Sequence, residues 1–208
     1  MEYYNINLWL GPAMNIHRNI RCGSNFEYYS EDPLVTGKMA AAIIRGVQSG
    51  KNRGATVKHF AGNNQEYNRL NSNSKINERA LREIYLKGFQ IAIEEAQPVA
   101  LMTSYNLINR VHTSQNRQLL HDTLREEWNF KGLIMTDWIR SGQVEFHTSV
   151  YPAQFIHLTI KAGNNIMMPG SKFDYDLILE KMYENELNKD DLLKCASKVY
   201  QTIELLNQ

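Results

Sequence analysis

The chain has 208 residues, of which 43% are hydrophobic and 22% charged, and its formal net charge is +1. This is the composition of a globular domain with a substantial core, and a charge so close to zero predicts no binding to nucleic acid or to acidic membranes. No apolar run reaches the roughly 18 residues that a membrane-spanning helix needs, and the first residues do not have the pattern of a secretory signal.

The first predicted elements alternate between strand and helix. An apolar alternation over residues 5–10 predicts a strand that ends before Gly11, and a polar loop follows it. Ser30 or Asp32 can cap a helix that has Pro33 in its first turn and runs to residue 49. Residues 54–60 are the second predicted strand.

The rest of the chain repeats this alternation. Helices are expected from Asn77 to about residue 97, from Asn116 to residue 128, over 152–162, and from Asn188 onward, where Asp191 lies near the positive end of the helix. Strands are expected over residues 99–105, over 133–135 with Asp137 at the end, and over 165–168. About five strands alternating with helices predict an α/β fold with a parallel sheet, in one domain spanning residues 1–208.

Polar and aromatic residues follow three of these strands. Lys58 and His59 end one strand, Tyr105 follows another, and Asp137 and Trp138 end a third. Ligand chemistry collects at the carboxyl ends of parallel strands, where an Asp can attack a sugar carbon and a Trp can stack on a sugar ring. The alternative is that Asp137 only caps the next helix. The coincidence at three strand ends favours a site.

Other kinds of site find little support. The six histidines show no H-E-x-x-H spacing, and no phosphate-binding glycine motif is present. Cys22 and Cys195 match no metal-ligand spacing. We therefore expect no metal and no cofactor. Two free thiols predict a reducing, cytoplasmic location.

Five strings of residues together resemble glycoside hydrolase family 3, on its β-glucosidase branch. They are Asn25-Phe-Glu-Tyr-Tyr-Ser-Glu-Asp-Pro33, Lys58-His-Phe-Ala-Gly-Asn-Asn64, Glu78-Arg-Ala-Leu-Arg-Glu-Ile-Tyr85, Met102-Thr-Ser-Tyr-Asn106 and Gly132-Leu-Ile-Met-Thr-Asp-Trp138. The hexosaminidase branch typically reads Lys-His-Phe-Pro-Gly-His, whereas Ala61 and Asn63 stand at those places here.

The resemblance implies a partial TIM-type (β/α)8 barrel from a retaining β-glycosidase that hydrolyses terminal β-glucosides. It makes Asp137 the nucleophile that forms a glycosyl-enzyme intermediate. Lys58, His59 and Arg69 would hold the sugar hydroxyls, Tyr105 would line the same subsite, and Trp138 would stack near its edge. Burial beside Lys58 and Arg69 would keep Asp137 ionised.

The chain also departs from the family pattern. Ser24 stands where the family usually has Arg, the first barrel strands and their sugar-binding Asp are absent, and Asn164-Asn165 replaces a string that often contains Asp. A retaining mechanism needs two carboxyl groups roughly 5 to 5.5 Å apart. Only Asp137 is assigned, because Glu66 is more readily interpreted as a solvated loop residue.

These departures leave alternatives. The chain is either catalytic when completed or an inactive fragment that binds sugar weakly or serves as a scaffold, and a flavin- or phosphate-binding barrel is a remote third possibility. About five strands cannot close an eight-stranded barrel, so we expect a homodimer or a complementing chain to cover the open edges. The competing expectation is a monomer in which residues 1–20 fold across the gap.

Overall fold

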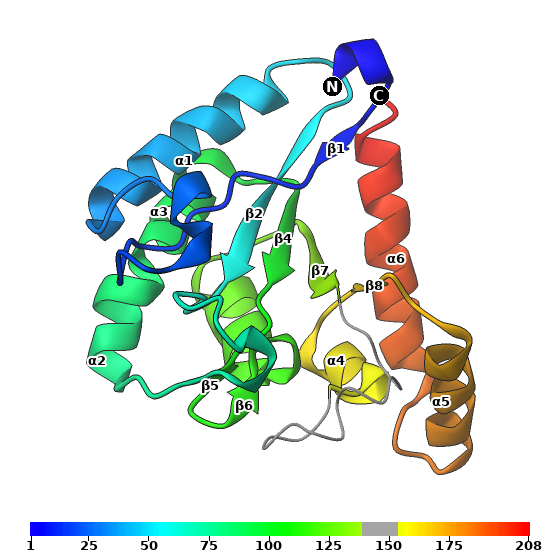
Figure 1. Cartoon of the computed structure of the whole chain (residues 1–208). Coiled ribbons are helices and arrows are strands. Elements are labelled where there is room, and N and C mark those ends of the chain that lie inside the picture. The colour runs from blue at the N-terminus through cyan, green and yellow to red at the C-terminus, as the bar shows by residue number, and fades with distance from the viewer. Residues whose placement is uncertain (139–153) are drawn as a thin grey trace.

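A five-stranded parallel sheet organises the protein, seen in a computed structural model that describes residues 1–138 and 154–208. The strand order is β1-β2-β4-β7-β8, and the sheet curls into half of a barrel (Figure 1). The strands are β1 Leu8–Trp9, β2 Gly54–Phe60, β4 Ala100–Thr103, β7 Leu133–Trp138 and β8 Ile166–Met168. The predicted partial barrel of about five parallel strands alternating with helices is confirmed.

Helices follow the strands along the chain. They are α1 Pro33–Gln48, α2 Glu78–Ala80, η4 Leu81–Tyr85, α3 Lys87–Ala96, η6 Gln118–Glu127, α4 Ile156–Ala162, α5 Lys172–Tyr183 and α6 Lys189–Leu205. Short 3-10 turns are η1 Glu2–Tyr4, η2 Gly23–Glu27, η3 Arg69–Asn71 and η5 Thr113–Gln115. Asp32, one of the two predicted caps of α1, accepts a backbone N–H with its side chain. Asn77 and Asn188, at the predicted helix starts, do the same, and these contacts fix where α1, α2 and α6 begin.

The two faces of the sheet carry different residues, because side chains alternate along a strand. Leu101 and Ile134 point to the outer face, where the main core also contains residues of α1, α3 and η6. Met102 and Met135 belong to a separate apolar cluster on the inner face of the half-barrel. Asp137 lies two residues beyond Met135, so the alternation places it on the inner face as well.

The C-terminal helix α6 packs against the inner face, where Leu8 of β1 joins the same apolar cluster. Val199 of α6 contacts the inner apolar cluster. At the end of the helix, the Asn7 side-chain amide donates to the Leu206 carbonyl oxygen at 3.3 Å, which links α6 to the start of β1. The two ends of the chain therefore lie side by side (Figure 1).

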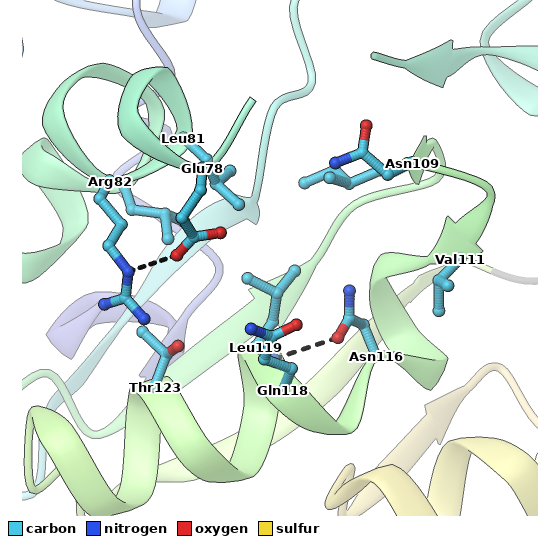
Figure 2. A pocket seen from close by; sticks show the side chains of 11 residues that line it. Glu78, Leu81, Arg82, Asn109, Val111, Asn116, Gln118, Leu119 and Thr123 are labelled. Atoms are coloured by element: carbon cyan, nitrogen blue, oxygen red, sulfur yellow. Dashed lines mark hydrogen bonds and ion pairs between the residues drawn. The ribbon is translucent and has the colours of Figure 1, made fainter. Parts of the chain in front are cut away.

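Two helical segments, η4 and η6, have π-helical hydrogen bonding and flank a hollow of about 250 Å³. Figure 2 shows Arg82 paired with Glu78 on one wall, at 2.5 Å, and Asn116 accepting from the Leu119 N–H on the other. None of the predicted sugar-site residues lines this hollow. It is thus separate from the candidate active site.

Some elements differ from the sequence prediction. Helix α5 and a small sheet of β3 Asn73–Ser74, β5 Leu107–Ile108 and β6 Val111–His112 were not predicted. The β1 strand is shorter than residues 5–10, since it pairs with β2 only through Leu8 and Trp9. The predicted helix start at Pro152 lies outside the described residues, and the described helix α4 begins at Ile156.

The guanidinium of Arg125, on η6, forms its hydrogen bonds with neutral oxygen atoms. Its guanidinium donates to the carbonyls of Phe130 and Gly132 and, at 3.4 Å, to Asn165 Oδ1. Burial lowers its pKa to about 10. Within residues 1–138 and 154–208, no carboxylate lies at ion-pair distance from Arg125. The Asn165 side chain thus occupies the place where a carboxylate would neutralise a poorly solvated cation.

Replacing Asn165 with Asp is therefore expected to stabilise the fold by about 1 kcal/mol, because a charge-assisted hydrogen bond replaces a neutral one at some cost in desolvation. Urea unfolding followed by circular dichroism measures the change. Asn185→Asp, the same substitution in an exposed turn, is the matched control. A variant no more stable than this control would show that Arg125 does not need the charge.

Candidate active site

The Asp137 carboxylate lies at the carboxyl end of β7, and the side chain is only 12% exposed. Its Oδ1 accepts the backbone N–H of Trp138 at 2.7 Å, and the Tyr105 hydroxyl also donates to the carboxylate. His59 Nε2 lies 3.9 Å from its Oδ2. The strand end thus presents a carboxylate whose orientation is fixed by donors on two sides.

Burial raises the pKa of Asp137 above its ordinary value, although the hydrogen bonds from Trp138 and Tyr105 and the charges of Arg69 and Lys58 act in the opposite direction. The resemblance implied that Lys58 and Arg69 would keep Asp137 ionised, and both cations do favour the charged form. The net direction is nevertheless upward because the loss of solvent outweighs the nearby positive charges, and ionisation of Asp137 at neutral pH stays a prediction. The two cations limit the rise but do not reverse it.

A chain of contacts runs from Glu66 through Arg69 and Tyr105 to Asp137. Glu66 Oε2 accepts from the Arg69 guanidinium at 3.0 Å, and this guanidinium stacks over the Tyr105 ring at 4.4 Å. The Tyr105 side chain is buried, and burial followed by the charge of Asp137 raises its pKa, so its hydroxyl keeps the proton that it donates. Glu66 therefore fixes Arg69, and Arg69 fixes Tyr105.

The structure corrects the interpretation of Glu66 as a solvated loop residue. Its side chain is 19% exposed, and its Oε1 accepts from Ser24 at 2.8 Å and from Asn63 at 3.0 Å. Burial opposes ionisation of Glu66, but the hydrogen bonds from Ser24, Arg69 and Asn63 outweigh it and lower the pKa of the carboxyl. An ionised Glu66 has no carboxyl proton to donate to a leaving group at neutral pH.

Lys58 ends the inner face of β2 and pairs with Glu27 at 3.6 Å. Both side chains are about three-quarters buried, with 21% and 26% exposed. Glu27 was not a predicted site residue. It lies within the Asn25–Pro33 string, and the sequence of that string does not indicate which acidic side chain contacts Lys58.

The His59 backbone is fixed by Asn15, whose side chain both accepts from the His59 N–H and donates to the His59 carbonyl, each at 2.9 Å. The imidazole ring is buried. Burial and the charge of Lys58 lower its pKa to about 4, against the opposing charge of Glu66. The ring is therefore neutral at pH 7, and its 3.9 Å approach to Asp137 is not an ion pair under that condition.

All six predicted site residues come from the segments at the carboxyl ends of β2, β4 and β7. Four of them are connected by the contacts described above: His59, Arg69, Tyr105 and Asp137. Lys58 acts on Asp137 and His59 through its charge. The sixth, the Trp138 side chain, is 56% exposed, with only its backbone N–H engaging Asp137. Among the described residues, no group of three side chains is arranged to hold a metal ion, and no helix is long and apolar enough to cross a membrane.

The sequence profile described as "Glycosyl hydrolase family 3 N terminal domain" matches residues 1–201. The chain belongs to glycosyl hydrolase family 3. Its relatives in this family include β-glucosidase A of Butyrivibrio fibrisolvens, 45% identical over 194 residues that cover 93% of this chain and 22% of that protein. Exo-α-(1→6)-L-arabinopyranosidase of Bifidobacterium breve is 53% identical over 129 residues, which cover 62% of this chain and 17% of that protein.

Solved structures of family 3 members have the same fold. β-Glucosidase 3B from Thermotoga neapolitana, in complex with α-D-glucose, superimposes with a TM-score of 0.84 at 42% identity and covers 93% of this chain and 26% of that one. The Bifidobacterium adolescentis family 3 β-glucosidase gives a TM-score of 0.87 at 39% identity, covering 98% and 28%. This family 3 chain therefore spans about a quarter of the length of the relatives that it matches.

Proposed function

We propose that the chain forms the nucleophile-bearing part of a retaining β-glycosidase that acts on terminal β-glucosides, with Asp137 as the nucleophile. The observation that carries this proposal is the Asp137 carboxylate itself, buried at a strand end and oriented by Tyr105 and the Trp138 N–H. Lys58, His59 and Arg69 surround it with donors for sugar hydroxyls. Membership of family 3 and the resemblance to proteins named β-glucosidases support the choice of sugar.

In the proposed first step, a carboxylate oxygen of Asp137 bonds to the anomeric carbon while the glycosidic C–O bond breaks. The electron pair of that bond goes to the leaving oxygen, which takes a proton from a general acid. In the second step, water attacks the anomeric carbon and gives a proton to the conjugate base of that acid, while the bond from this carbon to the Asp137 oxygen breaks and its electron pair returns to the carboxylate. The Tyr105 hydroxyl and the Trp138 N–H keep the attacking carboxylate in position throughout.

No described carboxyl group is assigned as the general acid. Glu66 is held in its ionised form by three donors, and Glu27 is paired with Lys58. We propose that the acid comes from residues outside the described ranges or from a completing chain. A substrate with a leaving group that needs no proton bypasses this requirement.

Such a substrate tests the proposal directly. An activated 2-deoxy-2-fluoro-β-glucoside is expected to label Asp137, giving one added sugar per chain by mass spectrometry and a modified peptide containing residues 133–138. An aryl α-L-arabinopyranoside, tested in parallel, checks whether the site prefers the sugar named for the Bifidobacterium breve relative. Label on another residue, or none, would contradict the assignment of Asp137.

A second candidate function is sugar binding without catalysis, and Ser24 favours it. The family usually has Arg at this position, whereas the buried Ser24 hydroxyl here donates to Glu66 Oε1. A charged donor beside the site is thus replaced by a neutral one. In this case glucose binds weakly and the activated glucoside leaves no label.

Restoring the charge at Ser24 is expected to strengthen glucose binding about ten-fold, because a charge-assisted hydrogen bond contributes roughly 1.5 to 3 kcal/mol. Calorimetric titration with glucose compares Ser24→Arg with the wild type. Ser24→Ala, which removes the hydroxyl without adding charge, is the control. Equal affinity of wild type and Ser24→Arg would indicate that position 24 does not contact the sugar.

We also propose a homodimer or a complementing chain as partner. Among the described strands, β1 and β8 each pair on one side only, and Trp9 and Leu10 are each 37% exposed at the β1 edge. Light scattering at micromolar concentration is expected to give about twice the chain mass of 24.1 kDa. A monodisperse species at 24.1 kDa would mean that α6 covers the inner face sufficiently. The cytoplasmic location stays a prediction.

A further inference from the structure

The His59 ring lies between two polar side chains, one facing each ring nitrogen. Nδ1 is 3.4 Å from the Tyr28 hydroxyl, and Nε2 is 3.9 Å from Asp137 Oδ2. The Tyr28 and His59 rings meet edge to face, with centroids 6.3 Å apart. Because Asn15 fixes the His59 backbone from both sides, the open choice at this residue is which ring nitrogen carries hydrogen.

Only one proton is available for the two ring nitrogens, since burial and the charge of Lys58 keep the His59 pKa at about 4. With hydrogen on Nδ1, the Nε2 lone pair would face the Asp137 carboxylate, and the two negative regions would repel. With hydrogen on Nε2, the N–H dipole points toward that carboxylate. The second tautomer then leaves a lone pair on Nδ1 that needs a donor inside a buried site.

The Tyr28 hydroxyl can supply that donor. The Tyr28 side chain is 6% exposed, and burial raises the pKa of its hydroxyl, so the proton stays on at neutral pH. The Asn63 amide already donates to the Tyr28 oxygen at 3.2 Å. An Nδ1–H of His59 would be a second donor facing the Tyr28 oxygen, whereas an Nδ1 lone pair can accept the Tyr28 hydroxyl proton. The Asn63 carbonyl, 3.1 Å away, is the alternative acceptor for the same hydroxyl.

We propose that Tyr28 is a positioning residue: its hydroxyl donates to Nδ1 of His59 and holds the ring in the tautomer with hydrogen on Nε2. His59 then presents an N–H donor to the Asp137 side of the site and to any sugar hydroxyl bound there. The consequence for catalysis rests on the proposed function, but the tautomer itself is a property of the free protein. It is therefore measurable without turnover.

Long-range proton–nitrogen NMR spectra of histidine-labelled protein at pH 7 test the proposal, because protonated and unprotonated ring nitrogens resonate far apart. The His59 signals are identified by their loss in His59→Gln. In the wild type we expect hydrogen on Nε2 and an unprotonated Nδ1. In Tyr28→Phe the ratio of the Nε2–H to the Nδ1–H tautomer is expected to fall about five-fold, which is the effect of one neutral hydrogen bond.

Tyr29→Phe is the matched control, because it removes the neighbouring phenol hydroxyl, whose ring packs against the main core. Its His59 signals should equal those of the wild type. Hydrogen on Nδ1 or a doubly protonated His59 in the wild type would overturn the proposal, and so would an unchanged ratio in folded Tyr28→Phe. The glucoside labelling of Asp137 is scored separately, so a failed reaction with an observed tautomer shift rejects only the proposed function.

Discussion

Asp137→Asn is expected to reduce labelling by the activated fluoro-glucoside on the order of 10⁴-fold or more, because an amide oxygen cannot form the glycosyl ester. The leaving group needs no proton, so this loss does not depend on the unassigned general acid. Intact-mass measurements over time give the rate. A variant labelled as fast as the wild type would remove Asp137 from the role of nucleophile.

The same variant is expected to fold at least as well as the wild type. The amide oxygen can still accept from the Trp138 N–H and from Tyr105. Because burial raises the folded-state pKa of Asp137, the stability linked to this group is present below its ordinary pKa and is lost as the pH rises through the folded value. At pH 7 the neutral Asn avoids that loss. Urea unfolding of both proteins at pH 7 separates lost chemistry from a lost fold.

Between pH 6.5 and pH 4, His59 is expected to lower the free energy of unfolding of the wild type by about 3 kcal/mol. Its folded-state pKa of about 4 lies below the ordinary value of about 6.5, so the unfolded chain binds a proton that the folded protein excludes. The stability from neutral His59 is therefore full above pH 6.5 and is lost as the pH falls toward 4. Urea unfolding across this range measures it.

In His59→Gln, the free energy of unfolding should not show the loss of about 3 kcal/mol that comes from His59 between pH 6.5 and pH 4. The loss that comes from the carboxylates should remain. His121→Gln is the control, because that histidine lies on η6 with 37% of its side chain exposed and pairs with Asp122. Parallel stability curves for the wild type and His59→Gln would show that His59 is not the buried neutral group described here.

Sequence patterns predicted most of the sheet because its strands are apolar runs bounded by turn residues. They predicted α1 and α6 well, since Asp32 and Asn188 are strong caps and precede regular apolar stripes. Helix α5 was missed because it has no such stripe: Phe173, Tyr175 and Leu179 are all about half exposed. The two-residue strands of the small sheet are too short to show any periodicity.

The site was predicted as a set of residues, but its connections were not. The residues that follow the strands could be identified because parallel strands end at one edge. The roles of Glu66, Glu27 and Tyr28 depend on long-range contacts with Arg69, Lys58 and His59, and a single sequence does not contain those distances. The direction of the Asp137 pKa also depends on burial, which only the folded structure provides.

The hydrogen bond from Asn7 to Leu206 has a consequence for protein engineering. Since the first strand and the last helix meet there, a short linker can join the two termini, and new termini can be opened in the exposed turn at Asn185. In this circular permutant, α6 would lead directly into β1, and the contact that now joins the two ends of the chain would become a covalent connection.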